Sequence, residues 1–165
     1  MKVQRIINPQ TGKDSWLLLG ADFLPVQPVL EYFRYLENTR KSPATIRTCA
    51  YHLKYYWTFL EQREVDWKDV DILMISDFVA WLRTPVRDGS IAMIQVGSPL
   101  VEASINGIIG AVSSFYEFSK LKGVAGKYIT LLTSRMAPGR RYKGFLHHLN
   151  QSKTTRTRLI KLKVQ

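Results

Sequence analysis

Residues 40–60 read RKSPATIRTCAYHLKYYWTFL, and this stretch says most about the fold of the chain. Ser42 is a preferred N-cap residue and Pro43 suits the first helical position, so the pair predicts a helix that begins directly behind Arg40 and Lys41. Large apolar residues then recur at three- and four-residue steps, as the buried stripe of an amphipathic helix requires. The predicted stripe comprises Ile46, Cys49, Ala50, Leu53, Trp57 and Leu60.

The opposite face of this predicted helix carries cations, hydroxyl groups and aromatic side chains. Its members are Thr45, Arg47, Thr48, Tyr51, His52, Lys54 and Tyr55. Such a mixture suits contacts to phosphates and to the edges of a nucleic-acid groove. We therefore expect this face to bind an anionic partner.

Net positive charge is confined to the end of the chain. The formal net charge is +11, yet residues 1–117 carry a net charge of −1, since they hold 12 Lys and Arg against 13 Asp and Glu. Residues 118–165 hold 12 Lys and Arg and no acid. The spacing of Arg140, Arg141 and Lys143 is typical of a basic linker, which would gain free energy from counterion release on a polyanion. A solvated surface is the alternative, but acid-free stretches of this length are uncommon in ordinary domains.

Length and composition indicate one domain with appendages. The 165 residues are 45% hydrophobic, which is enough to bury a core. No run approaches the roughly 18 apolar residues of a membrane span, and the start of the chain lacks the apolar core of a signal peptide. We expect a cytoplasmic protein without membrane association. Cys49, the single cysteine, lies on the apolar stripe and is expected to be a core residue with no redox role.

A short hairpin and a first helix are predicted ahead of Ser42. Residues 3–7 and 16–19 are β-prone runs on either side of a loop rich in turn formers, which is the pattern of a hairpin. Pro28 then leads into apolar residues at helical spacing. We expect this helix to end near Lys41, because the following Ser-Pro disfavours helical geometry.

Residues 64–71 are acid-rich and predict a connection after the Ser42 helix. Ser76 can cap a shorter helix that Pro85 closes. Residues 86–99 are expected to form a loop, with residues 91–96 as a candidate short strand.

A last long helix is predicted over residues 101–122, ending at Gly123. Its buried stripe is expected to contain Ile105, Ile108, Ile109, Val112, Phe115 and Tyr116, with Leu121 as a further candidate. The other face is small and polar: Asn106, Gly107, Gly110, Ser113 and Ser114, with Lys120 and Lys122 near the end. Small residues let a helix approach a DNA groove closely, and they serve close helix packing nearly as well.

Five short motifs follow one another along the chain. They are Ser42-Pro43-x-Thr45-Ile46, Tyr51-x-Leu53, Trp57-x-Phe59-Leu60, Ala103-Ser104-Ile105-Asn106 and Phe115-Tyr116-x-Phe118. With these motifs, residues 26–122 resemble the core-binding domain of tyrosine recombinases, the phage integrase and transposase group. The resemblance implies a mainly α fold, an orthogonally packed SAM-like bundle of four to five helices. It also implies that the second and fourth helices face the major groove and that a basic linker continues towards a catalytic domain.

The same resemblance implies a set of DNA contacts. From the predicted second helix and its start these would be Arg40, Lys41, Ser42, Thr45, Arg47, Thr48 and Lys54. From the fourth helix they would be Ser104, Asn106, Ser113 and Lys120, and from the linker Arg140, Arg141 and Lys143. Two departures blur the contacts: Ser104 stands where the family commonly has Thr, and the loop at residues 86–99 is longer than in compact members.

The catalytic constellation of that family is missing from this sequence. It requires arginines, a lysine, a His-x-x-Arg type motif and a tyrosine nucleophile, whereas His52, His147 and His148 each lack an arginine three residues on. We expect a non-catalytic N-terminal fragment of a phage- or mobile-element-encoded recombinase. Its parts would be an extension (residues 1–24), the DNA-binding bundle (25–123) and a basic linker (124–165). Double-stranded DNA and other recombinase protomers are the expected partners, and the fragment alone is expected to be monomeric.

Two other function classes stay open at the level of sequence. A helical protein–protein module would make the basic tail incidental, and a binder of single-stranded DNA or RNA would stack bases on Tyr51 and Tyr55. Metal, cofactor and acid–base chemistry is poorly supported. The acidic cluster has no histidine nearby, and Gly107-x-x-Gly110 inside a helix is a packing motif before it is a phosphate cradle. Beyond a short helix at residues 142–149, we expect residues 151–165 to be disordered on their own.

Overall fold

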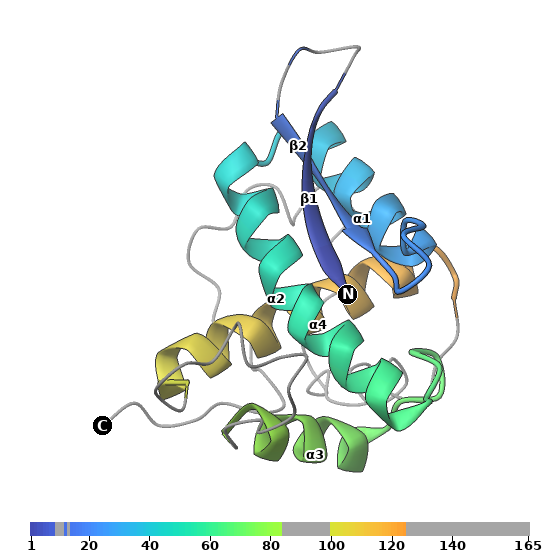
Figure 1. The fold of residues 1–165 in the computed structure, drawn as a ribbon, viewed down its shortest axis with the longest axis vertical. Helices are drawn as coiled ribbons and strands as arrows, with labels where there is room; N and C mark the ends of the chain where they lie inside the picture. The colour runs from blue at the N-terminus through green and yellow to red at the C-terminus, as the bar shows by residue number, and fades with distance from the viewer. Residues whose placement is uncertain (9–11, 13, 84–99, 125–165) are drawn as a thin grey trace, which may run out of the picture.

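The structure is a computed structural model that describes residues 1–8, 12, 14–83 and 100–124. Its elements are β1 (Lys2–Ile7), β2 (Asp14–Leu19), α1 (Gln27–Asn38), α2 (Pro43–Arg63), α3 (Ile72–Arg83) and α4 (Glu102–Leu121). In the view of Figure 1, α4 crosses behind α2, and the hairpin lies against α1 and α2. The described part is therefore mainly helical with one short antiparallel hairpin, as the sequence predicts.

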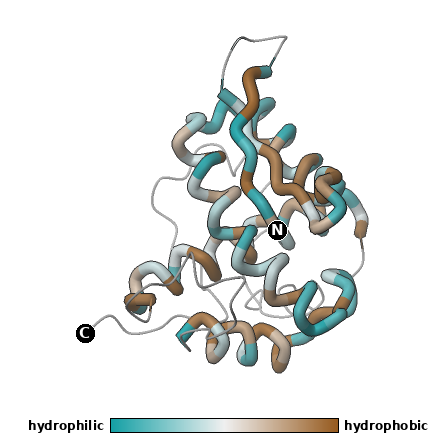
Figure 2. The backbone as a smooth tube through the Cα atoms, viewed as in Figure 1, coloured by the Kyte–Doolittle hydropathy of each residue, from teal (hydrophilic) through white to brown (hydrophobic). Residues whose placement is uncertain are grey.

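The hairpin contributes side chains to the same core as the helices. Its register pairs Val3 with Leu18 and Arg5 with Trp16, and paired residues point to the same face of the sheet. Trp16 and Leu18 on that face are buried in the core cluster. Figure 2 shows the difference between the strands, with hydrophobic brown along much of β2 and more hydrophilic teal along β1.

Helix α1 ends at Asn38, three residues before the predicted boundary. Arg40 adopts a left-handed conformation (φ 57°) there. Its N–H donates to the Glu37 carbonyl (2.9 Å), and the Lys41 N–H donates to the Leu36 carbonyl (2.9 Å). These bonds satisfy two carbonyls of the last turn and turn the chain towards α2. The Ser-Pro pair is therefore preceded by a backbone-made stop that the sequence reasoning did not anticipate.

Helix α2 begins as predicted, since the Thr45 N–H donates to the Ser42 hydroxyl (3.1 Å) and Pro43 follows the cap. Its buried face is wider than the predicted stripe, because Tyr56 and Phe59 are also fully buried. Cys49 is half-buried, and burial raises the pKa of its thiol, which disfavours the reactive thiolate.

The prediction that Ser76 caps α3 is wrong. The cap lies five residues earlier, at Asp71, where Oδ1 accepts from the Met74 N–H (2.8 Å), and the helix begins at Ile72. Ser76 is an exposed residue inside the helix. The acid-rich connection exists as predicted, and one of its acids takes the capping role assigned to the serine.

Helix α4 matches its predicted bounds to within one residue at each end, and Gly123, directly after the C-cap residue Lys122, is in the left-handed region (φ 75°). All six firmly predicted stripe residues are buried. Leu121 is 60% exposed, so its inclusion as a further candidate is wrong. It lies in the last turn, where the Schellman-type bonds Gly123 N–H to Lys120 O and Val124 N–H to Ser119 O end the helix.

An aromatic core joins α2, α4 and the connection between α2 and α3. Tyr116 donates its hydroxyl hydrogen to the Trp67 carbonyl (2.6 Å), so Tyr56 is the donor in its 2.6 Å contact with the Tyr116 hydroxyl. The Phe115 ring packs edge-on against Trp57 (5.0 Å between centroids) and Trp67 (5.3 Å). This network fixes the crossing of α2 and α4.

Several predictions fall outside the residues that the structure describes. They are the loop at residues 86–99 with its candidate strand, the helix at 142–149, the linker at 124–165 apart from its first residue, and the disorder of 151–165. Among the helices that are described, none is long and apolar enough to cross a membrane.

Candidate nucleic-acid interface

The corner between α1 and α2 presents exposed cations. Arg40 and Lys41 lie in the short connection, and Arg47 lies in the second turn of α2; all three are exposed. Within the part of the chain that the structure describes, none of them forms an ion pair with a carboxylate. Their charges are therefore available to an anionic partner.

The predicted hydroxyl contacts at this corner are partly used for local structure. Ser42 and Thr45 hydroxyls share a hydrogen bond (2.9 Å) in addition to the cap, and Thr48 donates its hydroxyl to the Ala44 carbonyl (3.0 Å). Only one hydrogen is used between Ser42 and Thr45, so one of these two hydroxyls can still donate to a phosphate oxygen, whereas the Thr48 hydrogen is already committed. At most one of the three hydroxyls can therefore donate to a phosphate without losing a hydrogen bond at the start of the helix.

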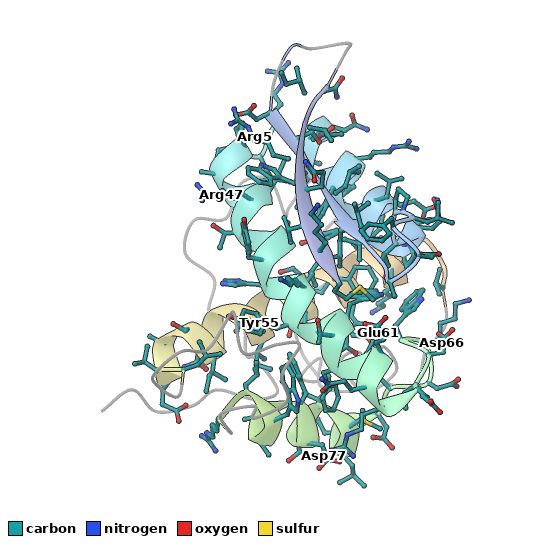
Figure 3. The ribbon with its side chains drawn as sticks, viewed as in Figure 1. Arg5, Arg47, Tyr55, Glu61, Asp66 and Asp77 are labelled. Carbon is teal, nitrogen blue, oxygen red and sulfur yellow. The ribbon has the colours of Figure 1, made fainter. Side chains whose placement is uncertain are left out.

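Arg47 rests on aromatic rings. Its guanidinium carbon lies 5.6 Å from the centroid of the Trp16 ring and 6.0 Å from that of Tyr51. Trp16 comes from β2, so the hairpin reaches the beginning of α2 at this point. Figure 3 shows Arg47 near the start of α2, with Arg5 of β1 close by in the view.

Lys54 follows Arg47 by seven residues, which is two helical turns and about 10 Å along the same flank of α2. Lys54 is half-buried, and this burial lowers the pKa of its ammonium group. Thr45 and Arg47, by contrast, lie about 200° apart around the helix axis. The structure thus divides the predicted α2 residues between two flanks, with Arg47 and Lys54 together on one of them.

The α4 residues divide in a similar way. Asn106, Ser113 and Lys120 follow one another at seven-residue intervals and form one row, with the first two half-buried and Lys120 exposed. Ser104 is exposed but lies about 200° around the axis from Asn106, so it does not belong to that row. The four predicted α4 contacts therefore do not lie in a single row.

His52 and Gly107 occupy the crossing of α2 and α4, so the expectation that both lie on open faces is corrected. A Cβ at Gly107 would lie 3.2 Å from His52 Cε1. Burial lowers the pKa of His52, and a hydrogen bond with the Gly107 backbone acts in the opposite direction. The close-packing alternative for Gly107 therefore holds at this position.

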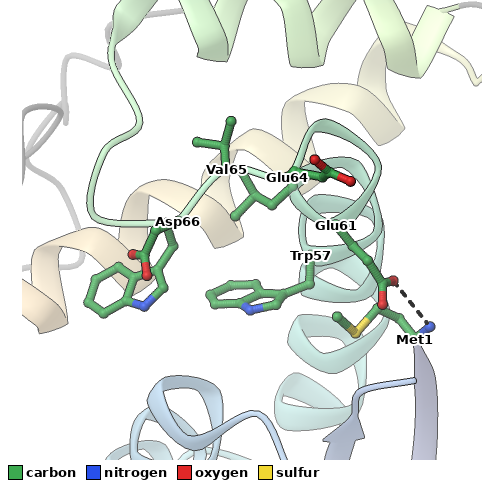
Figure 4. Close-up of a pocket in the computed structure, with 8 residues that line it drawn as sticks. Met1, Trp57, Glu61, Glu64, Val65 and Asp66 are labelled. Carbon is green, nitrogen blue, oxygen red and sulfur yellow. Dashed lines mark ion pairs between the residues drawn. The ribbon is translucent and has the colours of Figure 1, made fainter. Parts of the chain in front are cut away.

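The other end of α2 is acidic and borders a cavity of about 370 Å³. The cavity is lined by Met1, Trp57, Leu60, Glu61, Glu64, Val65, Asp66 and Trp67. In Figure 4, Glu61 and Asp66 lie on either side of Trp57, and the Met1 amine nitrogen lies 3.8 Å from Glu61 Oε2. Among the described residues, no three His, Cys, Asp or Glu side chains are grouped so that they could hold a metal ion. This end of the helix would repel a polyanion.

The predicted linker contacts Arg140, Arg141 and Lys143 lie outside the described residues.

The contact of Arg47 with the Trp16 ring was not predicted from the sequence, because the hairpin was taken to be an extension of the domain. The available signal was the spacing of Trp16 and Leu18, which places two large apolar side chains on one face of a strand.

Comparison with known proteins agrees with the fold. The family described as "Phage integrase, N-terminal SAM-like domain" matches residues 29–123. Transposase A from transposon Tn554 of Staphylococcus aureus is 36% identical over 166 residues, which covers 100% of this chain and 45% of the transposase, with the same values for strains Mu50 and N315. The chain thus spans less than half the length of these relatives. No solved structure gives a significant match.

The matched region contains α2 to α4 complete and all of α1 except its first two residues, and it includes the α2 and α4 motifs on which the resemblance rests. The chain therefore belongs to the phage integrase family of tyrosine recombinases and carries the N-terminal SAM-like domain of that family.

Proposed function

We propose that this chain binds duplex DNA for a site-specific recombinase and does not itself cut the strand. The observation that carries the proposal is the run of exposed cations at the start of α2, Arg40, Lys41 and Arg47, with no carboxylate partner among the described residues. A helix that presents unpaired cations at one end can neutralise backbone phosphates on one side of a groove.

We place catalysis outside this chain because the relatives are more than twice as long as the part that the chain matches. Catalytic residues would lie in a further domain, and the linker at residues 124–165 would extend the basic surface along the duplex. Other recombinase protomers would assemble on the same DNA. The separation of residues 1–24 from 25–123 stays a prediction, although Trp16 and Leu18 of the first segment are buried in the core of the second.

The geometry favours a duplex over a single strand. Tyr51 is 43% exposed, but its ring already faces Trp16, at 6.4 Å between centroids. Tyr55 is half-buried, and burial raises the pKa of its hydroxyl. Base stacking needs open ring faces, which neither side chain offers fully.

Fluorescence anisotropy of the purified chain with a labelled duplex, measured across a salt series, tests the proposal. Arg47→Glu should lower the affinity at least about tenfold and reduce the slope of log affinity against log salt, since one phosphate contact is replaced by a repulsive charge. The matched control is Arg63→Glu, which makes the same charge change in the same helix, at its acidic end, and should leave the affinity within about threefold of the parent.

Three outcomes contradict the proposal in different ways. Equal losses for the two variants would mean that only net charge matters. Tighter binding to a matched single strand or RNA would favour the stacking alternative. Absence of binding to any nucleic acid at low salt would favour a protein-partner module.

A further inference from the structure

Arg47 and Arg5 lie at the same end of the molecule, but the Arg5 guanidinium is paired with a carboxylate and the Arg47 guanidinium lies over aromatic rings. The Arg5 guanidinium grips the Asp14 carboxylate, with Nη2 at 2.7 Å from Oδ1 and 2.8 Å from Oδ2. That pairing neutralises its charge locally. Arg47 forms no ion pair among the described residues, and its guanidinium lies over the rings of Trp16 and Tyr51, which attract a cation through their electron-rich faces without cancelling its charge.

The two rings form a corner under the guanidinium. Their centroids are 6.4 Å apart and their planes are inclined by 54°. Trp16 is fixed because it is only 9% exposed and belongs to the core cluster, whereas Tyr51 stands on α2 one turn after Arg47. A long flexible side chain on such a corner loses part of its conformational freedom before it meets a ligand.

Tryptophan at position 16 has an unfavourable buried N–H group, which suggests that its ring face has a role of its own. Its indole nitrogen is buried and has no hydrogen-bond partner in the described part of the chain. A buried N–H without a partner is unfavourable, and phenylalanine or leucine would fill the strand position without it. Tryptophan offers the strongest cation–π face of the aromatic residues.

We propose that Trp16 and Tyr51 are positioning residues: they hold the Arg47 guanidinium as a preorganised fork for a phosphate of the DNA backbone. The inference rests on the proposed DNA-binding function. The hairpin would then contribute to the interface through Trp16, and not through its cation Arg5, which is already paired with Asp14. The planar guanidinium matters because it can bind a phosphate through two N–H groups while it stacks on a ring, which a lysine ammonium cannot do.

A double-mutant cycle on duplex affinity tests the proposal. The variants are Tyr51→Leu, Arg47→Ala and the combination of both, with Tyr51→Phe as the control that keeps the ring. Tyr51→Leu should weaken binding about two- to fivefold, the strength expected of an exposed cation–π contact, and should lower the salt slope. Tyr51→Phe should restore the parent affinity, and Tyr51→Leu should have no further effect when Arg47 is already alanine.

Trp16→Leu provides a second arm, read together with thermal unfolding because the residue is buried. A folded Trp16→Leu protein should show the same loss and the same dependence on Arg47. Additive losses in the cycle, or a Tyr51→Phe protein as weak as Tyr51→Leu, would overturn the proposal while leaving DNA binding intact. If Arg47→Ala itself has no effect, the proposed role of Arg47 in DNA binding fails first, and the two failures are thereby distinguished.

Discussion

The two ends of α2 share one core and present opposite surfaces. At its start, Arg40, Lys41 and Arg47 are exposed without carboxylate partners among the described residues, whereas its last turn and the following connection carry Glu61, Glu64 and Asp66. The helix has 21 residues, so the two surfaces are separated by about 30 Å. One rigid element can therefore hold a polyanion at one end and exclude it from the other.

The ends also differ in how the backbone is satisfied. The start relies on a side chain, since the Ser42 hydroxyl accepts from the Thr45 N–H. The end relies on backbone conformation: Glu64 is left-handed (φ 54°), and the Val65 N–H donates to the Leu60 carbonyl (3.1 Å). The stability of the first end thus depends on a chemical group, and that of the second on a strained residue.

The largest effect is expected from breaking the core that both ends share. Leu53 is fully buried midway along α2, so Leu53→Asp would place an unpaired charge there and cost more than about 4 kcal/mol, a large part of the roughly 5–15 kcal/mol that stabilises an ordinary domain. Circular dichroism melts would show it. Ile109→Asp on α4 should behave alike, whereas Leu53→Met, which conserves volume, should cost less than about 1.5 kcal/mol. A cooperative melt for Leu53→Asp near the parent temperature would mean that α2 faces the core differently.

A smaller pair of changes should move stability in opposite directions at the two ends. Ser42→Ala removes the N-cap and should cost about 1 kcal/mol. Glu64→Gly relieves a left-handed non-glycine residue and should stabilise the protein by roughly 0.5–1 kcal/mol. Glu64→Ala is the matched control, because it removes the carboxylate and keeps the Cβ, and it should give no such gain. Urea unfolding measures all three; a gain for Glu64→Ala equal to that for glycine would assign the effect to charge instead of conformation.

The sequence predicts what depends on local pattern, and misses what depends on neighbours in space. The cap at Ser42, the stripe of α4 and the stop at Gly123 follow from residues within one or two turns of each other. The cap of α3 was assigned to Ser76 because a serine precedes an apolar run, whereas Asp71 precedes the whole helix, and both are acceptable N-cap residues. Local rules could not choose between the two caps, because the choice depends on the burial of Val70 and Ile75 in the core.

The candidate site shows the same limit. Helical periodicity placed Arg47 on an outward face, but it could not reveal that β2 brings Trp16 beneath it. It also placed His52 outward, because His52 does not lie on the apolar stripe, whereas Gly107 of α4 packs against it. Both missed contacts join residues more than 30 positions apart in the chain, which no local pattern encodes.

The smallest effect is expected at this crossing, as a pH dependence of stability. Burial lowers the pKa of His52 below its ordinary value of 6.5, so the folded state favours the neutral ring. Below about pH 6.5 the unfolded chain therefore binds more protons at His52 than the folded chain does. The stability that comes from the neutral ring is complete above that pH and is lost as the pH falls further. His52→Gln keeps hydrogen-bonding groups and removes the titration. The difference in unfolding free energy between parent and variant should therefore shrink from pH 7.5 to pH 5, and taking the difference subtracts the carboxylates at the acidic end of α2. A difference that stays constant or grows on acidification would mean that the imidazolium is tolerated between α2 and α4, so that this crossing is more open to water than its packing indicates.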